Sequence, residues 1–303
     1  MMELRTLRYF VKLAEHLHFS LAAEALDIAP SALSMQLQGL EKELGVKLVA
    51  RTKRSVSLTG AGELFLVEAK ATLQQAEQSM LIAKRAGRGE IGKLEVGFVM
   101  SAACSGIVQK LLSAYRLQYP YVQVNLQALE SPLQIQLLEQ GKLDACIVRN
   151  LYGNPDLFEH VTLLNEPIVA ALSNTHPLAR KANLKAIDLA QEAFIAPQFE
   201  RDFGFNQHIL AIGEKAGFTP RFNQRTKDFI TTLTLVASGF GVAAVPQSVS
   251  ALPIPGIAFR PFSDVTERSE LMMLFRRHDT APTIAHLRAL AELLASQETS
   301  PAE

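Results

Sequence analysis

The chain has few cysteines, no net charge and no long hydrophobic run. Its two cysteines, Cys104 and Cys146, lie far apart and lack His or acidic neighbours at metal-ligand spacing, so neither a disulfide framework nor a metal site is predicted. The 30 Lys and Arg balance the 30 Asp and Glu, which excludes a polybasic tail. No apolar run approaches the roughly 18 residues of a membrane span, and the N-terminus has no signal-peptide core. We therefore expect a cytoplasmic protein with no cofactor and no membrane partner.

Catalytic motifs are equally scarce. Gly239, Gly241 and Ala244 fit the pattern G-x-G-x-x-A, but a dinucleotide site needs a strand before this motif and a helix after it. Here the order is reversed, because a predicted helix at 230–237 precedes a predicted strand at 242–245. The sequence has no G-x-S-x-G or H-E-x-x-H motif, and its 7 His are scattered. We predict no catalytic residue and expect the protein not to be an enzyme.

The 303 residues, 48% of them hydrophobic, are enough for two or three domains. The stretch 19–45 predicts a helix-turn-helix, with Ser20 as the N-cap of its first helix. The second helix buries a stripe of four leucines and ends at Gly45: Leu33, Leu37, Leu40 and Leu44. Its opposite face presents mostly short polar side chains that suit base edges in a major groove: Ser31, Ser34, Met35 and Gln38. The alternative is an ordinary helical hairpin with a polar outer face.

A basic hairpin follows these helices. Two β-prone runs, 46–50 and 55–58, flank Arg51, Lys53 and Arg54. Cations beside a recognition helix contact phosphates and position a protein on the duplex without reading its sequence. Residues 1–59 hold eight Lys and Arg against six Asp and Glu, so the prediction of DNA binding rests on pattern and not on charge.

The helices and the wing carry residues at fixed spacing that resemble a known family signature. At these positions the chain is similar to the LysR-type transcriptional regulators: Phe19, Ser20, Ala22, Ala23, Leu26, Ala32, Leu33, Ser34, Gln36, Leu37, Leu40, Glu41, Leu44, Gly45, Leu48, Arg51, Leu58, Thr59 and Gly62. The resemblance implies a winged helix-turn-helix that binds a double-stranded DNA operator. Pro30, Ser31 and Met35 depart from it, standing where Gln, Pro and Arg are frequent. Base recognition therefore cannot be carried over in detail.

A long helix is predicted from Thr59 to about Arg88. Apolar residues recur along it at three and four residues, as in the seam of a coiled coil: Leu66, Ala69, Leu73, Ala76, Met80 and Ala83. This predicts a homodimer formed through the linker helix, which would hold two DNA-binding domains at half-site spacing. The alternative is that the stripe packs on its own effector domain. The resemblance implies that dimers pair into a homotetramer that acts as an activator, with RNA polymerase as a further candidate partner.

From Lys93 onward, short apolar runs alternate with helical segments, which is typical of parallel βα units. The fold class is α/β, with a winged helix-turn-helix at 1–59, a linker helix at 60–89 and a two-lobed effector domain at 92–303. Lobe 1 covers about 92–163 and 267–303, and lobe 2 about 164–266. The family resemblance continues more loosely at Gly97, Ser101, Gly141, Asp144, His176, Pro177, Leu178, Gly239, Gly241 and Pro246. It implies a domain similar to type 2 periplasmic binding proteins, with crossovers near Leu163 and Glu267.

Ligands of such lobes bind beyond the carboxyl ends of strands. Ser101 is predicted to follow the first strand at a helix start, and Ser131 to form a capping box with Gln134. Together they would receive a carboxylate, although plain N-capping is the alternative. Arg149 ends its strand and would either pair an anion or cap the lobe.

Three phenylalanines follow the predicted strand at 194–196: Phe199, Phe203 and Phe205. They would form an aromatic wall of the site or a satellite core. We expect the effector to be a small aromatic or unsaturated carboxylate. Residues 3–11, Arg149 and 259–262 look most like the family branch that controls aromatic-acid catabolism, such as the phenylpropionate and benzoate/muconate regulators.

These observations predict a DNA-binding transcriptional regulator controlled by a small-molecule effector. One alternative is the same class of regulator responding to a non-acid ligand. Another is thiol oxidation at Cys104, which is predicted near a helix N-terminus where a thiol can be activated. A pure solute-binding protein is disfavoured by the DNA-binding domain and by the lack of a signal peptide.

Overall fold

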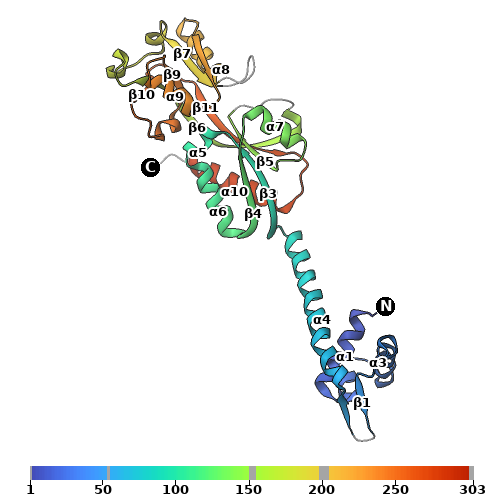
Figure 1. Ribbon diagram of the computed structural model, residues 1–303. Helices are drawn as coiled ribbons and strands as arrows, with labels where there is room; N and C mark the ends of the chain where they lie inside the picture. Colours follow the sequence, from blue (N-terminus) through green and yellow to red (C-terminus); the bar gives the residue numbers. More distant parts are fainter. Residues whose placement is uncertain (1, 53–54, 150–154, 198–204, 300–303) are drawn as a thin grey trace. The chain divides into compact units, whose positions relative to one another are not determined.

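The computed structural model describes residues 2–52, 55–149, 155–197 and 205–299. The chain divides into two compact units, Met1–Arg85 and Ala86–Glu303 (Figure 1). Within these residues, no helix is both long enough and apolar enough to cross a membrane.

The N-terminal unit has the predicted winged helix-turn-helix fold. Its elements are α1 (Leu4–His16), α2 (Phe19–Ala25), α3 (Pro30–Leu44), the antiparallel hairpin β1 (Val49–Arg51) and β2 (Val56–Leu58), and most of α4 (Gly60–Gly87). The small side chains of Ala22 and Ala23 are fully buried, which lets α2 pack closely on its neighbours. Helix α3 begins with Pro30 in its first turn and ends at Gly45 with φ 71°, where the left-handed backbone favours glycine.

Two sequence predictions for these helices are wrong in detail. The N-cap of α2 is His18 and not Ser20: the His18 ring accepts a hydrogen bond from the Leu21 N–H. Leu44 is 37% exposed and does not belong to the buried stripe of α3, because α3 ends at this residue and its last turn extends past the core. Leu33, Leu37 and Leu40 are buried as predicted.

Helix α4 does not present the predicted seam along its whole length. Ala69 is buried, and Leu66 and Leu73 pack against the core of the N-terminal unit, because this part of the helix lies on the helix-turn-helix. The large apolar residues that α4 leaves exposed are Leu64, Val67, Met80, Leu81 and Ile82. A dimer seam on α4 therefore remains a prediction, and of these exposed residues only Met80 belongs to the stripe predicted from the sequence.

The C-terminal unit contains a seven-stranded sheet with the order β10-β6-β11-β5-β3-β4, in which β9 also pairs with β6. Its long central strands are β6 (Phe158–Ser173) and β11 (Arg268–Arg276). The first part of β6 pairs with β11 up to Pro167, and its last part pairs with β10 and β9. Strand β6 therefore carries the chain from the first lobe to the second, and β11 carries it back.

Each lobe has its own core around parallel strands (Figure 1). The first contains β3 (Ile91–Phe98), α5 (Met100–Cys104), α6 (Ile107–Gln118), β4 (Tyr121–Ala128), α7 (Ser131–Glu139), β5 (Ala145–Val148) and α10 (Pro282–Thr299). The second contains β7 (Ala193–Pro197), α8 (Asn206–Ala216), β8 (Arg221–Thr226), α9 (Phe229–Ala237), β9 (Ala243–Pro246), β10 (Ile257–Pro261) and the 3₁₀ turns η2 (Pro177–Arg180), η3 (Ala186–Leu189) and η4 (Gln247–Ala251). A further 3₁₀ turn, η1 (Pro155–Leu157), precedes β6. Strand β3 is parallel to β4 and β5, and β7 is parallel to β8, so their carboxyl ends can converge on one site.

Candidate functional site

A cavity of about 230 Å³ lies where five strands end. Each strand is followed by residues that line it: β3 by Val99, Met100 and Ser101, β4 by Leu129, Glu130 and Ser131, β5 by Arg149, β7 at Pro197, and β8 by Lys227, Asp228 and Phe229. Ala128 and Phe205 complete the lining. The first three strands belong to the first lobe and the last two to the second. The cavity is therefore an interlobe site, at the edge where ligands of α/β sheets bind.

Arg149 is the most buried charge in the cavity wall and is already paired. Its Nη2 donates a 2.8 Å hydrogen bond to Oε1 of Glu166, which lies in β6 at the crossover. Its Nη1 donates to the hydroxyl of Ser269 at 2.9 Å, and its Nε to the hydroxyl of Ser101 at 2.8 Å. Burial lowers the pKa of the guanidinium, and the Glu166 carboxylate opposes that shift. Arg149 was predicted either to pair an anion or to cap the lobe. In the structure its charge is paired within the protein, by Glu166. Arg149 can therefore donate hydrogen bonds to a ligand, but it has no unpaired positive charge to attract one.

Ser101 and Ser131 both line the cavity and are both buried. Ser101 is the second residue of α5, whose N-cap is Val99. Because its hydroxyl accepts from Arg149, its own hydrogen can be donated to a ligand oxygen.

The capping box predicted for Ser131 and Gln134 is wrong. Ser131 is the first residue of α7, Glu130 is the N-cap, and no side chain caps the helix. Gln134 instead donates from Nε2 to the backbone carbonyl of Leu129 at 2.8 Å. The alternative, that Ser131 serves only as the N-cap of α7, is therefore also wrong.

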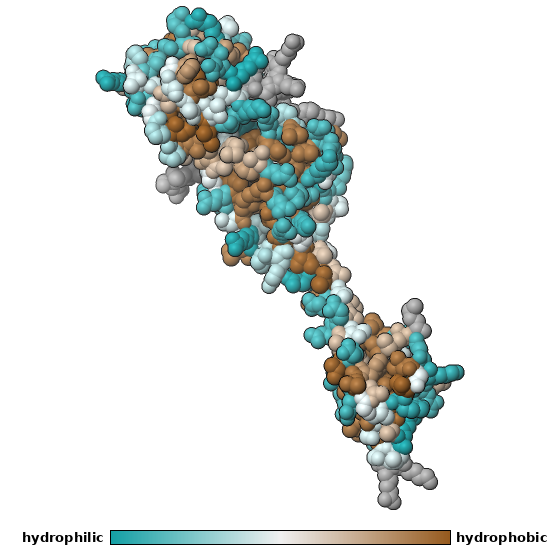
Figure 2. Space-filling view, viewed as in Figure 1, coloured by the Kyte–Doolittle hydropathy of each residue, from teal (hydrophilic) through white to brown (hydrophobic). Residues whose placement is uncertain are grey.

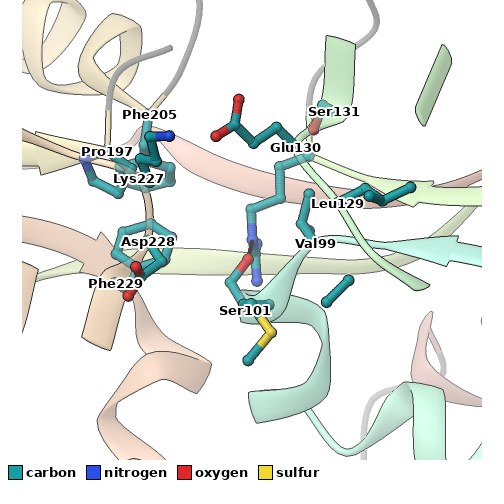
Figure 3. Close-up of a pocket in the computed structure, with 13 residues that line it drawn as sticks. Val99, Ser101, Leu129, Glu130, Ser131, Pro197, Phe205, Lys227, Asp228 and Phe229 are labelled. Atoms are coloured by element: carbon teal, nitrogen blue, oxygen red, sulfur yellow. Dashed lines mark hydrogen bonds between the residues drawn. The ribbon is translucent and has the colours of Figure 1, made fainter. Parts of the chain in front are cut away.

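The second lobe contributes charged residues that sequence reasoning missed. Asp228 is the N-cap of α9, and its carboxylate accepts from the N–H of Thr231 at 2.8 Å and from its hydroxyl at 3.0 Å. Lys227 precedes it, and Glu130 faces the cavity from the first lobe (Figure 3). The rule that identified Ser101 and Arg149, a polar residue directly after a strand, applies equally to Lys227 and Asp228 after β8.

Aromatic side chains wall the cavity on the side of the second lobe. Phe205 and Phe229 line it and meet edge to face, with ring centroids 5.2 Å apart. Of the predicted aromatic wall, Phe205 therefore lies at the cavity, whereas Phe199 and Phe203 lie outside the described residues.

The candidate DNA-binding face is built on α3 and the wing. Met35 is 65% exposed, Ser31 and Gln38 are exposed, and Ser34 is half-buried. Arg51 in β1 donates from Nη1 to the Ser34 hydroxyl at 2.8 Å. Its guanidinium carbon also lies 4.3 Å from the centroid of the Phe19 ring, a cation–π arrangement. Arg51 is thus held beside the recognition helix, while Lys53 and Arg54 lie outside the described residues.

A buried carboxylate joins α3 to the start of the wing. Glu41 is 4% exposed and accepts from the backbone N–H groups of Leu48 and Val49 at 3.0 and 3.2 Å and from Lys47 Nζ at 2.7 Å. Burial raises its pKa, but these hydrogen bonds outweigh burial and lower the pKa below its ordinary value. Glu41 is therefore ionised at neutral pH and fixes the wing relative to α3.

The activation predicted for the Cys104 thiol is wrong. Cys104 is the last residue of α5 and lies two residues before the N-cap of α6, as predicted, but burial raises the pKa of its thiol. Burial also raises the pKa of Cys146 to about 12. Among the described residues, no group of three His, Cys, Asp or Glu could hold a metal ion.

Comparisons with known proteins match both units. Residues 4–63 match the family described as "Bacterial regulatory helix-turn-helix protein, lysR family", and residues 87–297 match "LysR substrate binding domain". The chain is 34% identical over 287 residues to the uncharacterized HTH-type transcriptional regulator YnfL of Escherichia coli K12, covering 94% of this chain and 96% of the relative. It is 32% identical over 291 residues to the Hca operon transcriptional activator HcaR of the same organism, covering 96% and 97%. A solved structure of full-length CbnR with its target DNA matches with a TM-score of 0.83 and 27% identity, covering 97% of this chain and 100% of that one.

Proposed function

The chain belongs to the LysR family of bacterial transcriptional regulators, and on that premise we propose that it binds a DNA operator and responds to a small aromatic carboxylate. The DNA-binding residues would be Ser31, Ser34, Met35 and Gln38 on the recognition helix, with Arg51, Lys53 and Arg54 in the wing. The matched relatives are transcriptional regulators, which supports a regulatory role over an enzymatic one.

The effector proposal is supported by one observation above all, the cavity at the ends of five strands. Its volume of about 230 Å³ exceeds the roughly 150 Å³ apolar cavity known to bind benzene, so it has room for a single ring with a small polar substituent. Phe205 and Phe229 give it apolar walls, and the hydroxyls of Ser101 and Ser131 provide donors for a carboxylate. These features support the proposal that the chain belongs to the aromatic-acid branch of the family.

Signal transmission would use the junction of the two lobes. The cavity is lined from both lobes, and Arg149 connects Ser101 in its wall to Glu166 in the crossover strand. A ligand that fits one arrangement of the lobes better than another shifts the population toward that arrangement. In the oligomer this bias would alter the spacing of the DNA-binding units and thereby activate transcription, with RNA polymerase as the candidate partner.

Two sets of exposed apolar residues support a dimer that pairs into a tetramer. Helix α4 exposes Leu64, Val67 and Leu81 at 76%, 64% and 46%, a stripe that a second α4 would cover in a homodimer. The first lobe exposes Leu117, which is 84% exposed, and Tyr121, the first residue of the edge strand β4. Figure 2 shows apolar side chains gathered on a face of this lobe, as expected for a second contact between copies of the chain.

Selection of bound duplexes from a random-sequence library by the full-length protein would test this function. We expect one enriched motif with two half-sites related by approximate two-fold symmetry and separated by whole helical turns. Adding benzoate should change the affinity or the footprint at that site in the wild type, and the change should be lost in Ser131→Val. Enrichment of no sequence would contradict the operator proposal, and a motif that no aromatic acid affects would contradict the effector proposal.

A further inference from the structure

Two charged side chains in the ligand cavity form no ion pair with any other residue that the structure describes. Glu130 comes from the first lobe, between β4 and α7, and Lys227 from the second, between β8 and α9. Over the residues that the structure describes, neither forms an ion pair. Figure 3 shows the Glu130 carboxylate and the Lys227 side chain pointing toward each other from opposite sides of the cavity.

The other two charges of the cavity wall are already satisfied. Arg149 is paired with Glu166 at 2.8 Å. The Asp228 carboxylate accepts two hydrogen bonds from Thr231 at the start of α9, where the helix dipole also favours a negative charge. Among the cavity residues that the structure describes, a ligand therefore meets one cation and one anion outside any ion pair, each on a different lobe.

We infer that Glu130 and Lys227 select the chemical class of the ligand: a compound with one negative group and, opposite it, a hydrogen-bond donor or an ammonium group. This rests on the proposed function and narrows it. Lys227 attracts the negative group, and the hydroxyl of Ser101 can donate to it, since that hydroxyl accepts from Arg149. The opposite end of the ligand must satisfy Glu130, because a carboxylate that loses water without gaining a donor is costly.

A dicarboxylate does not fit this arrangement. Its second negative group would lie against Glu130, and two like charges close together oppose each other's ionisation. Lys227, the one unpaired cation among the described residues of the cavity wall, cannot neutralise both negative groups. The pocket should thus accept monoanions and zwitterions and reject dianions of the same size.

Binding of three para-related compounds to the full-length protein tests this inference by titration calorimetry: benzoate, 4-(aminomethyl)benzoate and terephthalate. We expect 4-(aminomethyl)benzoate to bind the wild type at least about tenfold more tightly than terephthalate. Glu130→Gln should reduce this ratio to near one, and Glu130→Lys should reverse it. Lys227→Met should weaken all three about tenfold. Glu139→Gln, at the exposed far end of α7, is the matched control and should change nothing.

The outcomes separate this inference from the function on which it rests. Terephthalate binding at least as tightly as benzoate to the wild type, or an unchanged ratio in a cooperatively melting Glu130→Gln or Glu130→Lys protein, would overturn the selectivity and leave the carboxylate effector standing. Binding of none of the three compounds to the wild type would overturn both.

Discussion

The Arg149 guanidinium and the Glu166 carboxylate form a buried ion pair between the end of β5 and the middle of β6. Nη2 and Oε1 are 2.8 Å apart, and each side chain is 7% exposed. Glu166 also accepts from the backbone N–H of Ser248 at 2.5 Å and from its hydroxyl at 2.9 Å. Ser248 lies in η4 of the second lobe, so the pair binds the cavity wall, the crossover strand and the second lobe to one another.

Removing one member of this pair should destabilise the protein far more than removing both. A single Arg149→Met or Glu166→Leu substitution leaves a buried charge without its partner, at a cost of about 3–5 kcal/mol. In the double variant Arg149→Met with Glu166→Leu no buried charge remains, and the loss should be much smaller. Urea unfolding of the wild type, the two single variants and the double variant measures this, through the free energy of unfolding of the C-terminal unit in each protein. A double variant as unstable as the sum of the two single ones would contradict it.

Glu41 should make the N-terminal unit sensitive to acid. Its pKa in the folded chain lies below the ordinary value of 4.5, so the unfolded chain binds the proton more tightly. The stabilisation is therefore present above about pH 4.5 and is lost as the pH falls through the lower, folded pKa. The protection factors for hydrogen exchange in peptides covering 30–58, which correct for the pH dependence of the intrinsic rate, should fall across this range in the wild type. The fall should be weaker in Glu41→Gln and unchanged in Glu24→Gln, a control at an exposed position, and a similar response in all three proteins would contradict the assignment.

The sequence predicted those parts of the site that depend on local pattern. Ser101 and Arg149 come just after predicted strands, Phe205 comes later in the segment after another one, and all three line the cavity. The partners of Arg149 were not predictable, because Glu166 and Ser269 lie 17 and 120 residues away and meet it only in the folded sheet. The capping box failed because Glu130 is extended, with φ −68° and ψ 145°, and starts the helix one residue earlier than the motif requires. The predicted α4 seam was wrong for Leu66, Ala69 and Leu73, which pack on the core of the N-terminal unit. A heptad pattern shows that a helix face is apolar, but it does not show whether a partner helix or the chain's own core covers that face.

Two glycines of the N-terminal unit should respond in opposite ways to alanine. A Cβ on Gly62 in α4 would lie 2.0 Å from the backbone oxygen of Leu48, so Gly62→Ala forces the helix away from the wing, at a cost of about 1–3 kcal/mol. A Cβ on Gly39 in α3 would meet nothing within 4 Å, and Gly39→Ala should stabilise the helix by about 0.5–1 kcal/mol. Scanning calorimetry of the full chain without DNA would detect both shifts in the transition of the N-terminal unit. A neutral Gly62→Ala would show that this close approach of α4 and Leu48 is not required.

Arg51 and Met35 should affect DNA binding differently, although both lie at the recognition helix. Arg51 is held by the Ser34 hydroxyl and the Phe19 ring, which orients its remaining N–H groups for phosphate contacts. Arg51→Ala should therefore weaken binding to all sequences and lower by about one unit the slope of the logarithm of the binding constant against the logarithm of the salt concentration.

Met35 is apolar and 65% exposed, so it suits contact with a thymine methyl group. Met35→Ala should therefore reduce the preference for one base pair by about 1 kcal/mol. Fluorescence anisotropy at several salt concentrations, with the selected operator and single-base variants of it, measures both effects. A sequence-selective loss in Arg51→Ala, or a uniform loss in Met35→Ala, would reverse the two assignments.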